Sequence, residues 1–330
     1  MNNEEILVSV IVPIYNVQNY LERCIKSIIA QEHHNLQILL INDGSTDGSY
    51  DICLKYERMD SRIKVINKEN GGAADTRNKG IDYSNGDYIV FIDGDDYVKA
   101  NYVKELLNAV IEKQAQIAVC SFDIMGYNNN IIEKVYLNEF EDVVSGRELL
   151  IAGMTDFAYK YIVVWNKIYK KELFNYVKFD KGKLYEDEYF YFKLFWQCKH
   201  IVIVYDSLYY YVQREGSAMQ SPMTLVKINA KCEMHQERIN FYREKEDKAL
   251  FYVACQMYCN WLVECFRSYL NLLQRSDKLR MQEQIRKYVH DAQKKVDNPN
   301  AIKIQNILGC INLSLAGHIK SLYLKLRGNE

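Results

Sequence analysis

The chain has 330 residues, 48% hydrophobic and 26% charged, which is enough for one large globular domain or two ordinary ones. Its 42 lysines and arginines nearly balance its 43 aspartates and glutamates, and a net charge of −1 gives no support for a nucleic-acid-binding protein. From the acidic start, Met1–Glu5, we expect no signal peptide. The sequence contains no run of 18 apolar residues, so we also expect no membrane-spanning helix. Nine scattered cysteines without a CxxC pair favour reduced thiols in a cytoplasmic protein.

The first hundred residues alternate between predicted strands and predicted helices. Apolar runs predict buried strands at 6–14, 36–41, 63–66 and 88–92, with helices at 20–30 and 50–56 and a short one around 77–80 between them. This alternation predicts a parallel sheet with right-handed crossovers. The chain lacks both GxGxxG and GxxxxGK[ST], which argues against a nicotinamide-dependent enzyme and against a P-loop ATPase.

The remaining elements are less regular. We predict a helix at 101–113, a strand at 117–122, a hairpin or loop region at 123–145 and a strand or turn at 163–169. An aromatic helix at 189–197 and two short strands at 201–204 and 208–212 follow. From about residue 225 the pattern is helical to the end, with a last helix near 301–327.

An acidic cluster directly follows the strand at 88–92. Asp93 and Asp95 are two residues apart, so on extended backbone their side chains point the same way. Close carboxylates raise each other's pKa, and a hard divalent cation such as Mg²⁺ or Mn²⁺ removes that cost. The alternative is a solvated acidic turn. Gly94 lets the backbone bend close to a ligand, and Asp96 is expected to face a donor sugar or a helix N-terminus.

Six segments, taken in order, resemble one family: SVIVPIYN (9–16), INDGSTDGS (41–49), NGGAADTRNKGI (70–81), GDYIVFIDGDD (86–96), WNKIYKKELF (165–174) and YEDEYF (185–190). They are similar to the inverting glycosyltransferases of family 2, which include bacterial capsule and cell-surface polysaccharide enzymes. The resemblance covers about residues 6–220. It implies an α/β fold of the GT-A type, a Rossmann-like nucleotide-binding mixed sheet flanked by helices, followed by a C-terminal helical region.

The resemblance also implies domains and donor-site residues. Residues 1–224 would be the catalytic domain, with a nucleotide-binding half at 1–100 and an acceptor-binding half at 101–224, and 225–330 the helical region. Asp93 and Asp95 match the DxD motif and would hold the metal, Mn²⁺ or Mg²⁺. The nucleotide-sugar-binding set would be Pro13, Tyr15, Asn16, Asp43, Arg77, Asp93, Gly94 and Arg214. Asp43 matches the family position whose carboxylate accepts a hydrogen bond from an N–H group of the nucleotide base. The pair Asp75-Thr76, directly before Arg77, departs from the usual motif. The alternative to nucleotide binding by Arg77 is a salt bridge from its guanidinium to Asp75 or Asp43.

The catalytic and acceptor-side residues follow from the same resemblance. Asp187 matches the catalytic base, because an inverting transfer needs one carboxylate to take the proton of the acceptor hydroxyl. The alternative is a helix-start acid pair formed with Glu186. Trp165, Asn166 and Glu186 match the acceptor side, although Trp165 is equally compatible with a place in the core.

The resulting functional prediction is a metal-dependent transfer of a hexose or N-acetylhexosamine from a UDP-sugar to a glycan with inversion to a β-linkage. The acceptor would be a lipid-linked oligosaccharide or a protein-attached glycan, in cell-surface polysaccharide or glycoconjugate synthesis. Alternatives are a dTDP- or GDP-sugar donor and a non-catalytic nucleotide- or glycan-binding module. The localisation would be cytoplasmic. Peripheral contact with the inner face of the cell membrane, or a homodimer through the C-terminal helices, is left open by the basic amphipathic end.

Overall fold

The computed structural model describes residues 3–126, 128, 130–152, 159–214 and 222–295. Residues 1–220 and 221–330 form two compact units. The helix predicted near 301–327 lies outside the described residues, as does the basic amphipathic surface assigned to it. The functional roles predicted for the domains stay predictions.

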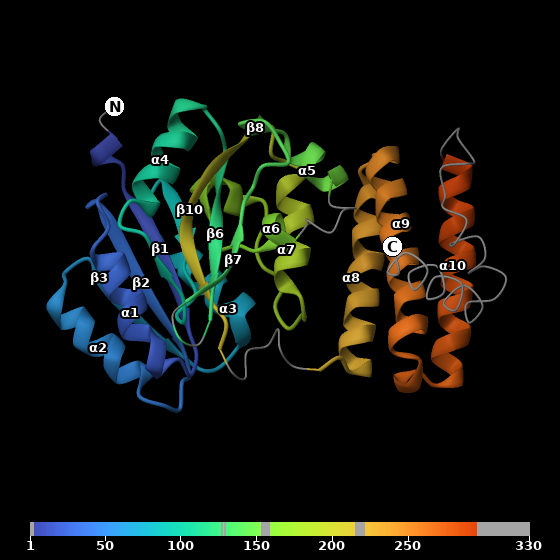
Figure 1. Ribbon diagram of the computed structural model, residues 1–330, viewed down its shortest axis with the longest axis horizontal. Coiled ribbons are helices and arrows are strands. Elements are labelled where there is room, and N and C mark those ends of the chain that lie inside the picture. Colours follow the sequence, from blue (N-terminus) through green and yellow to red (C-terminus); the bar gives the residue numbers. More distant parts are fainter. Residues whose placement is uncertain (1–2, 127, 129, 153–158, 215–221, 296–330) are drawn as a thin grey trace. The chain divides into compact units, whose positions relative to one another are not determined.

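The first unit begins with four parallel strands (Figure 1). They are β1 (Val8–Ile14), β2 (Leu36–Asp43), β3 (Ile63–Lys68) and β4 (Tyr88–Phe91), in the order β3-β2-β1-β4. In the register Val10 lies opposite Ile38 on one side and Val90 on the other. Because β1 and β4 are buried along nearly their whole length, their sequences are apolar without alternation. The predicted parallel sheet is confirmed for this half of the unit.

Three helices make the crossovers between these strands. A short 3₁₀ turn, η1 (Asn3–Glu5), precedes β1, and the helices are α1 (Gln18–Ile29), α2 (Ser49–Met59) and α3 (Gly72–Tyr83). Helix α3 contacts both β1 and β2. Gly80 allows the backbone of α3 to approach β1 closely, because any other residue would place its Cβ only 2.3 Å from Ile11 Cγ2.

The second half of the unit extends the sheet with mixed directions. It contains β5 (Tyr97–Val98), α4 (Tyr102–Glu112), β6 (Ile117–Met125), β7 (Ile131–Val135), β8 (Val143–Val144), α5 (Gly146–Ala152), α6 (Tyr159–Ile162), β9 (Lys167–Lys170), η2 (Lys171–Asn175), α7 (Glu186–Phe195) and β10 (Ile201–Val212). Strand β9 lies antiparallel between β4 and β6 and joins the two halves into one sheet.

Two predicted elements differ from the structure. The segments 201–204 and 208–212 are not separate strands but parts of β10, which pairs parallel with β6 along its length. The register shifts between Val204 and Ser207 and again before Tyr209, so a bulge takes up the polar residues that suggested a break. Helix α7 begins at Glu186 rather than 189, and its first turn carries three acids, which stabilise a helix N-terminus.

The second unit is helical over its described residues. Helices α8 (Leu225–Glu244), α9 (Lys248–Ser268) and α10 (Arg275–Lys295), with a 3₁₀ turn η4 (Leu270–Leu272), pack as α8 on α9 and α9 on α10 (Figure 1). Thr224 and Asp247 cap the first two helices through their side-chain oxygens. In the part of the chain that the structure describes, every helix is too short or too polar to cross a bilayer.

Candidate functional site

The predicted donor-site residues gather where the parallel strands end. Tyr15 and Asn16 directly follow β1, Asp43 is the last residue of β2, and Asp93 and Asp95 come just after β4. Because β1, β2 and β4 run in the same direction, their carboxyl ends share one edge of the sheet. In open α/β sheets this edge is where ligands bind.

The turn after β1 is fixed by the turn after β2. Asn16 has a left-handed backbone, with φ of 51°, which Asn tolerates better than most residues. Its backbone N–H donates to Ser45 Oγ at 3.1 Å, and its Oδ1 accepts from the Thr46 N–H at 2.8 Å. Pro13 pairs with Ile41 inside the sheet, whereas the Tyr15 side chain is 49% exposed. Tyr15 therefore offers a free aromatic face at the edge.

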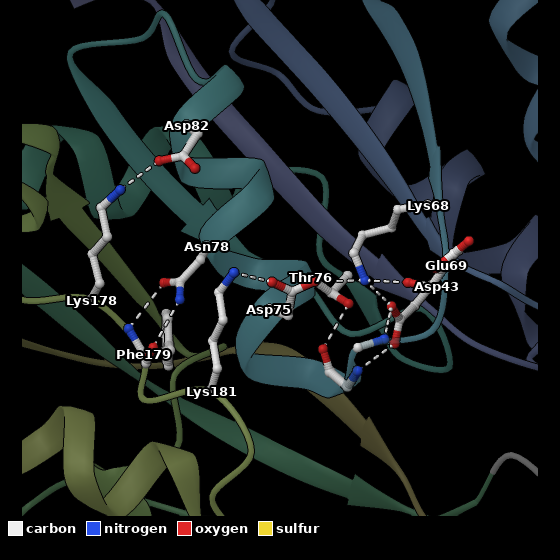
Figure 2. A network of polar contacts seen from close by, with 12 residues as sticks. Asp43, Lys68, Glu69, Asp75, Thr76, Asn78, Asp82, Lys178, Phe179 and Lys181 are labelled. Carbon is white, nitrogen blue, oxygen red and sulfur yellow. Dashed lines mark hydrogen bonds and ion pairs between the residues drawn. The ribbon is translucent and has the colours of Figure 1, made fainter.

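Asp43 is the centre of a polar network on α3 (Figure 2). Its buried carboxylate forms an ion pair with Lys68 and accepts the backbone N–H groups of Gly71 and Gly72, each at 2.9 Å. Lys68 also binds Asp75 at 2.7 Å. Asp43 thus fixes the turn that leads into α3, in addition to any contact with a ligand.

Arg77 joins the DxD motif to the start of α7. Its Nη2 donates to Asp93 Oδ1 at 3.2 Å and its Nη1 to Glu186 Oε1 at 2.8 Å. The predicted alternative partners, Asp75 and Asp43, are therefore wrong. The Arg77 side chain is buried, and its Nε has no hydrogen-bond partner among the described residues. A buried N–H without an acceptor is uncommon and suits an anionic or hydroxyl-bearing ligand.

Asp95 is held by Arg214, whose Nε donates to Asp95 Oδ2 at 2.5 Å. Asp96 does not face a sugar or a helix end: it is fully buried, accepting the Tyr209 hydroxyl at 2.6 Å and the Val212 N–H at 2.8 Å. Gly94 is needed for packing, since a Cβ there would lie 3.2 Å from both Pro13 O and Val17 Cγ2.

The acidic pair fits a divalent cation in one particular way. No group of three His, Cys, Asp or Glu side chains that could hold a metal by itself occurs among the described residues. Mg²⁺ commonly takes one or two carboxylates and completes its shell with substrate phosphates and water. Asp95, already bound by a cationic guanidinium, together with Asp93, supplies that minimal set of hard oxygens.

Asp187 lies in the first turn of α7 beside Glu186. Burial, and next the charges of Glu186 and Glu188, raise the pKa of the Asp187 carboxyl to about 7, against a lowering effect of Arg77. A carboxylate with a pKa near neutrality is a stronger proton acceptor than an ordinary aspartate. The predicted alternative, a helix-start acid pair, describes the location correctly, and the charge of Glu186 contributes to the shift after burial.

The three residues assigned to the acceptor side have different surroundings. Trp165 is buried and stacks on Tyr209 with ring centroids 4.3 Å apart. Asn166 is fully buried and donates to the carbonyl oxygens of Cys120 at 2.9 Å and Lys160 at 3.1 Å. Glu186 binds Arg77 and so belongs with the DxD acids. These contacts are structural, and acceptor binding by the three residues stays a prediction.

One supporting residue, Tyr209, was missed from the sequence. Tyr209 also accepts the Asp93 N–H at 3.2 Å, so it holds both Asp93 and Asp96. Lys167 is fully buried, and burial lowers the pKa of its ammonium to about 7. The apolar character of β10 gave no sign of the Tyr209 contacts, whereas Lys167 lies in the WNK segment, which resembles the acceptor-side wall together with Trp165 and Asn166.

A cavity of about 320 Å³ lies along α3, away from the DxD acids and Asp187, none of which lines it. Its lining residues are Lys68, Asp75, Asn78, Lys79, Asp82, Lys178 and Lys181. Most of these charges neutralise each other: Lys178 pairs with Asp82 and Lys181 with Asp75. The chemistry therefore places the candidate site at the sheet edge and not in this cavity.

Known proteins resemble the chain in sequence and in fold. The model for Glycosyl transferase family 2 matches residues 9–181. Glycosyltransferase GlyA of Streptococcus pneumoniae is 40% identical over 224 residues, 64% of this chain but only 31% of GlyA. The uncharacterized glycosyltransferase EpsJ of Bacillus subtilis is 32% identical, with 72% of this chain and 70% of EpsJ covered.

Among solved structures, residues 1–349 of S. aureus TarS in complex with UDP-GlcNAc superimpose with a TM-score of 0.68. The sequence identity is 19%, and the match covers 96% of this chain and 91% of that one. This likeness supports the α/β GT-A fold with its C-terminal helices. The family match covers more than half of the chain, and it includes Asn16, Asp43, Arg77 and both DxD acids. The chain is a glycosyltransferase and belongs to family 2.

Proposed function

We propose that the chain transfers a hexose or N-acetylhexosamine from a UDP-sugar to a glycan acceptor, with inversion to a β-linkage, in the synthesis of a cell-surface polysaccharide or glycoconjugate. One observation carries the proposal: a single side chain, Arg77, binds both Asp93 of the DxD motif and Glu186, the neighbour of Asp187. The groups for the donor diphosphate and the candidate base therefore belong to one site.

In this reaction Asp187 accepts the proton of the acceptor hydroxyl while the hydroxyl oxygen attacks the anomeric carbon. The new carbon–oxygen bond forms on the face opposite the bond to the diphosphate, which breaks and leaves its electron pair on the nucleoside diphosphate. Attack from the opposite face inverts the configuration. The pKa of about 7 lets Asp187 take the proton near neutral pH and keep it while the product leaves.

The departing diphosphate carries negative charge that the site must neutralise. Arg77, with an unpartnered Nε, and Arg214, which follows β10, bind the DxD carboxylates, and Arg23 donates to the Asp95 carbonyl oxygen at 3.5 Å. A divalent cation held by Asp95 and Asp93 would supply further charge neutralisation. TarS was crystallised with UDP-GlcNAc and with UDP, which supports a uridine nucleotide as the donor for this chain.

The test is a panel of UDP-, dTDP- and GDP-sugars, each with Mn²⁺, Mg²⁺ or EDTA, read by thermal shift and by hydrolysis of the sugar nucleotide. We expect stabilisation by a UDP-sugar that needs the cation, and loss of this response in Asp95→Asn. Asp277→Asn, in α10, is the control for a general effect of removing a carboxylate. Absence of any response to all sugar nucleotides would favour the binding-module alternative.

A further inference from the structure

The Asp43 carboxylate has little hydrogen-bonding capacity left for a ligand. Its Oδ1 accepts from the Lys68 ammonium and from the Gly71 N–H, and its Oδ2 accepts from the Gly72 N–H (Figure 2). A carboxylate has about four acceptor positions, so these three bonds leave one, on Oδ2. That position suits a single N–H donor.

Lys68 has no N–H left for a ligand. Its ammonium has three N–H groups, and the structure shows three acceptors: the Asp43 carboxylate, Asp75 Oδ2 at 2.7 Å and the Glu69 carbonyl at 2.6 Å. Its side chain is only 14% exposed. Lys68 therefore acts on a ligand only through Asp43, by occupying one position on Oδ1 and leaving the remaining acceptor position on Oδ2.

Asp75 determines where the Lys68 ammonium lies. It stands in the first turn of α3, and its two oxygens bind different lysines, Lys68 through Oδ2 and Lys181 through Oδ1 (Figure 2). Hydrogen bonds from Lys181 and then from Lys68 hold the pKa of the Asp75 carboxyl below its usual range. Asp75 belongs to the pair Asp75-Thr76, at which the sequence departs from the motif that it otherwise resembles.

We propose that Asp75 is a positioning residue for the nucleotide base of the donor. By holding the Lys68 ammonium on Asp43 Oδ1, it keeps one lone pair of Oδ2 aimed at an imide N–H, the group that uracil and thymine present and cytosine lacks. The inference rests on the proposed function, because it assumes that a nucleoside diphosphate binds at Asp43. It adds a residue outside direct ligand contact that sets base selectivity.

The experiment compares UDP with N3-methyl-UDP, which lacks the imide N–H, by calorimetric titration in the presence of Mn²⁺. In the parent protein the ratio of the two Kd values measures the bond to Asp43. In Asp75→Ala we expect this ratio to fall by about fivefold, the equivalent of roughly one hydrogen bond. Asp82→Ala, which removes the exposed Lys178 pair on the same helix, should leave the ratio unchanged.

Lys68→Met is the second variant, and it should lower the ratio at least as much as Asp75→Ala. Equal weakening of both nucleotides, with an unchanged ratio in both variants, overturns the inference, because a purely structural role predicts that result. If the parent protein binds no UDP at all, the proposed function itself fails, and this outcome is distinct from an unchanged ratio. Melting temperatures of all variants show whether each is folded.

Discussion

Arg214 Nε donates to Asp95 Oδ2 at 2.5 Å, so an internal cation binds the acid that we propose as a metal ligand. A divalent ion held by Asp95, as proposed, would compete with Arg214 for this carboxylate. If Asp95 holds the metal with the diphosphate, Arg214 becomes free to bind a phosphate oxygen in its place.

The first prediction concerns this competition. Arg214→Met should raise the Mn²⁺ affinity of the nucleotide-free protein by about three- to tenfold, because the metal no longer displaces an ion pair. Titration followed by the electron paramagnetic resonance of free Mn²⁺ measures it directly. Arg267→Met, which removes a pair with Glu264 in α9, is the control. An unchanged affinity would show that the two cations do not share Asp95.

The second prediction is the pH dependence of transfer. Burial and the neighbouring acids raise the pKa of Asp187 to about 7, and only the ionised carboxylate accepts a proton. The rate should therefore fall as pH decreases below about 7 and level off above it. Asp187→Asn should lower kcat by about a thousandfold or more, with little change in the binding of UDP. A profile flat between pH 5.5 and 8 would argue against this residue as the base.

The third prediction concerns the geometry of Arg77. One guanidinium binds Asp93 and Glu186 through different nitrogens, and a lysine ammonium cannot reproduce this fork. Arg77→Lys should lower kcat by about ten- to a hundredfold while the charge is kept. Arg62→Lys provides a matched control, since Arg62 also binds a carboxylate through two nitrogens, that of Asp60. Equal activity of Arg77→Lys and the parent would mean that Arg77 contributes only its positive charge and not the geometry of its guanidinium.

The parallel half of the fold could be predicted because its strands are apolar runs and its turns carry the polar residues. The direction of β9 could not, since the short segment 167–170 contains no turn signal that fixes its neighbours. Spacing after a predicted strand indicated Asp93, and the family resemblance indicated Asn16 and Asp43; all three lie at the edge because their strands end together.

The partners of those edge residues depend on packing between distant segments. Arg77 and Glu186 are 109 positions apart, and Asp96 and Tyr209 are 113 apart, so local pattern carries no information about either pair. The same limit explains why the sequence offered Arg77, and not two lysines, as a partner of Asp75. Its two lysines come from β3 and from the segment before α7, which meet only in the folded chain.

The fourth prediction concerns the approach of α3 to β1. Gly80→Ala should destabilise the protein by about 1–3 kcal/mol, because the added methyl would lie 2.3 Å from Ile11 Cγ2. Denaturant unfolding measures the change. Gly48→Ala is the control, since the methyl there meets the flexible end of Gln18. A neutral Gly80→Ala would mean that α3 moves outward at no cost, which should also displace Arg77.

The last prediction links the candidate base to stability. The folded-state pKa of Asp187 is raised from an ordinary 3.8 to about 7. Below pH 3.8 the carboxyl is neutral in both the folded and the unfolded chain, and the folded protein buries no charge at this position. The free energy of unfolding decreases as pH rises through 7, because the folded protein must then bury an ionised carboxylate. Asp187→Asn avoids that charge, so its melting temperature should exceed the parent's at pH 8 by several degrees and by much less at pH 5. Glu233→Gln in α8 is the control for a general charge effect. A gain that is the same at both pH values would mean that Asp187 is not a costly carboxylate, and would remove the physical basis for its assignment as the base.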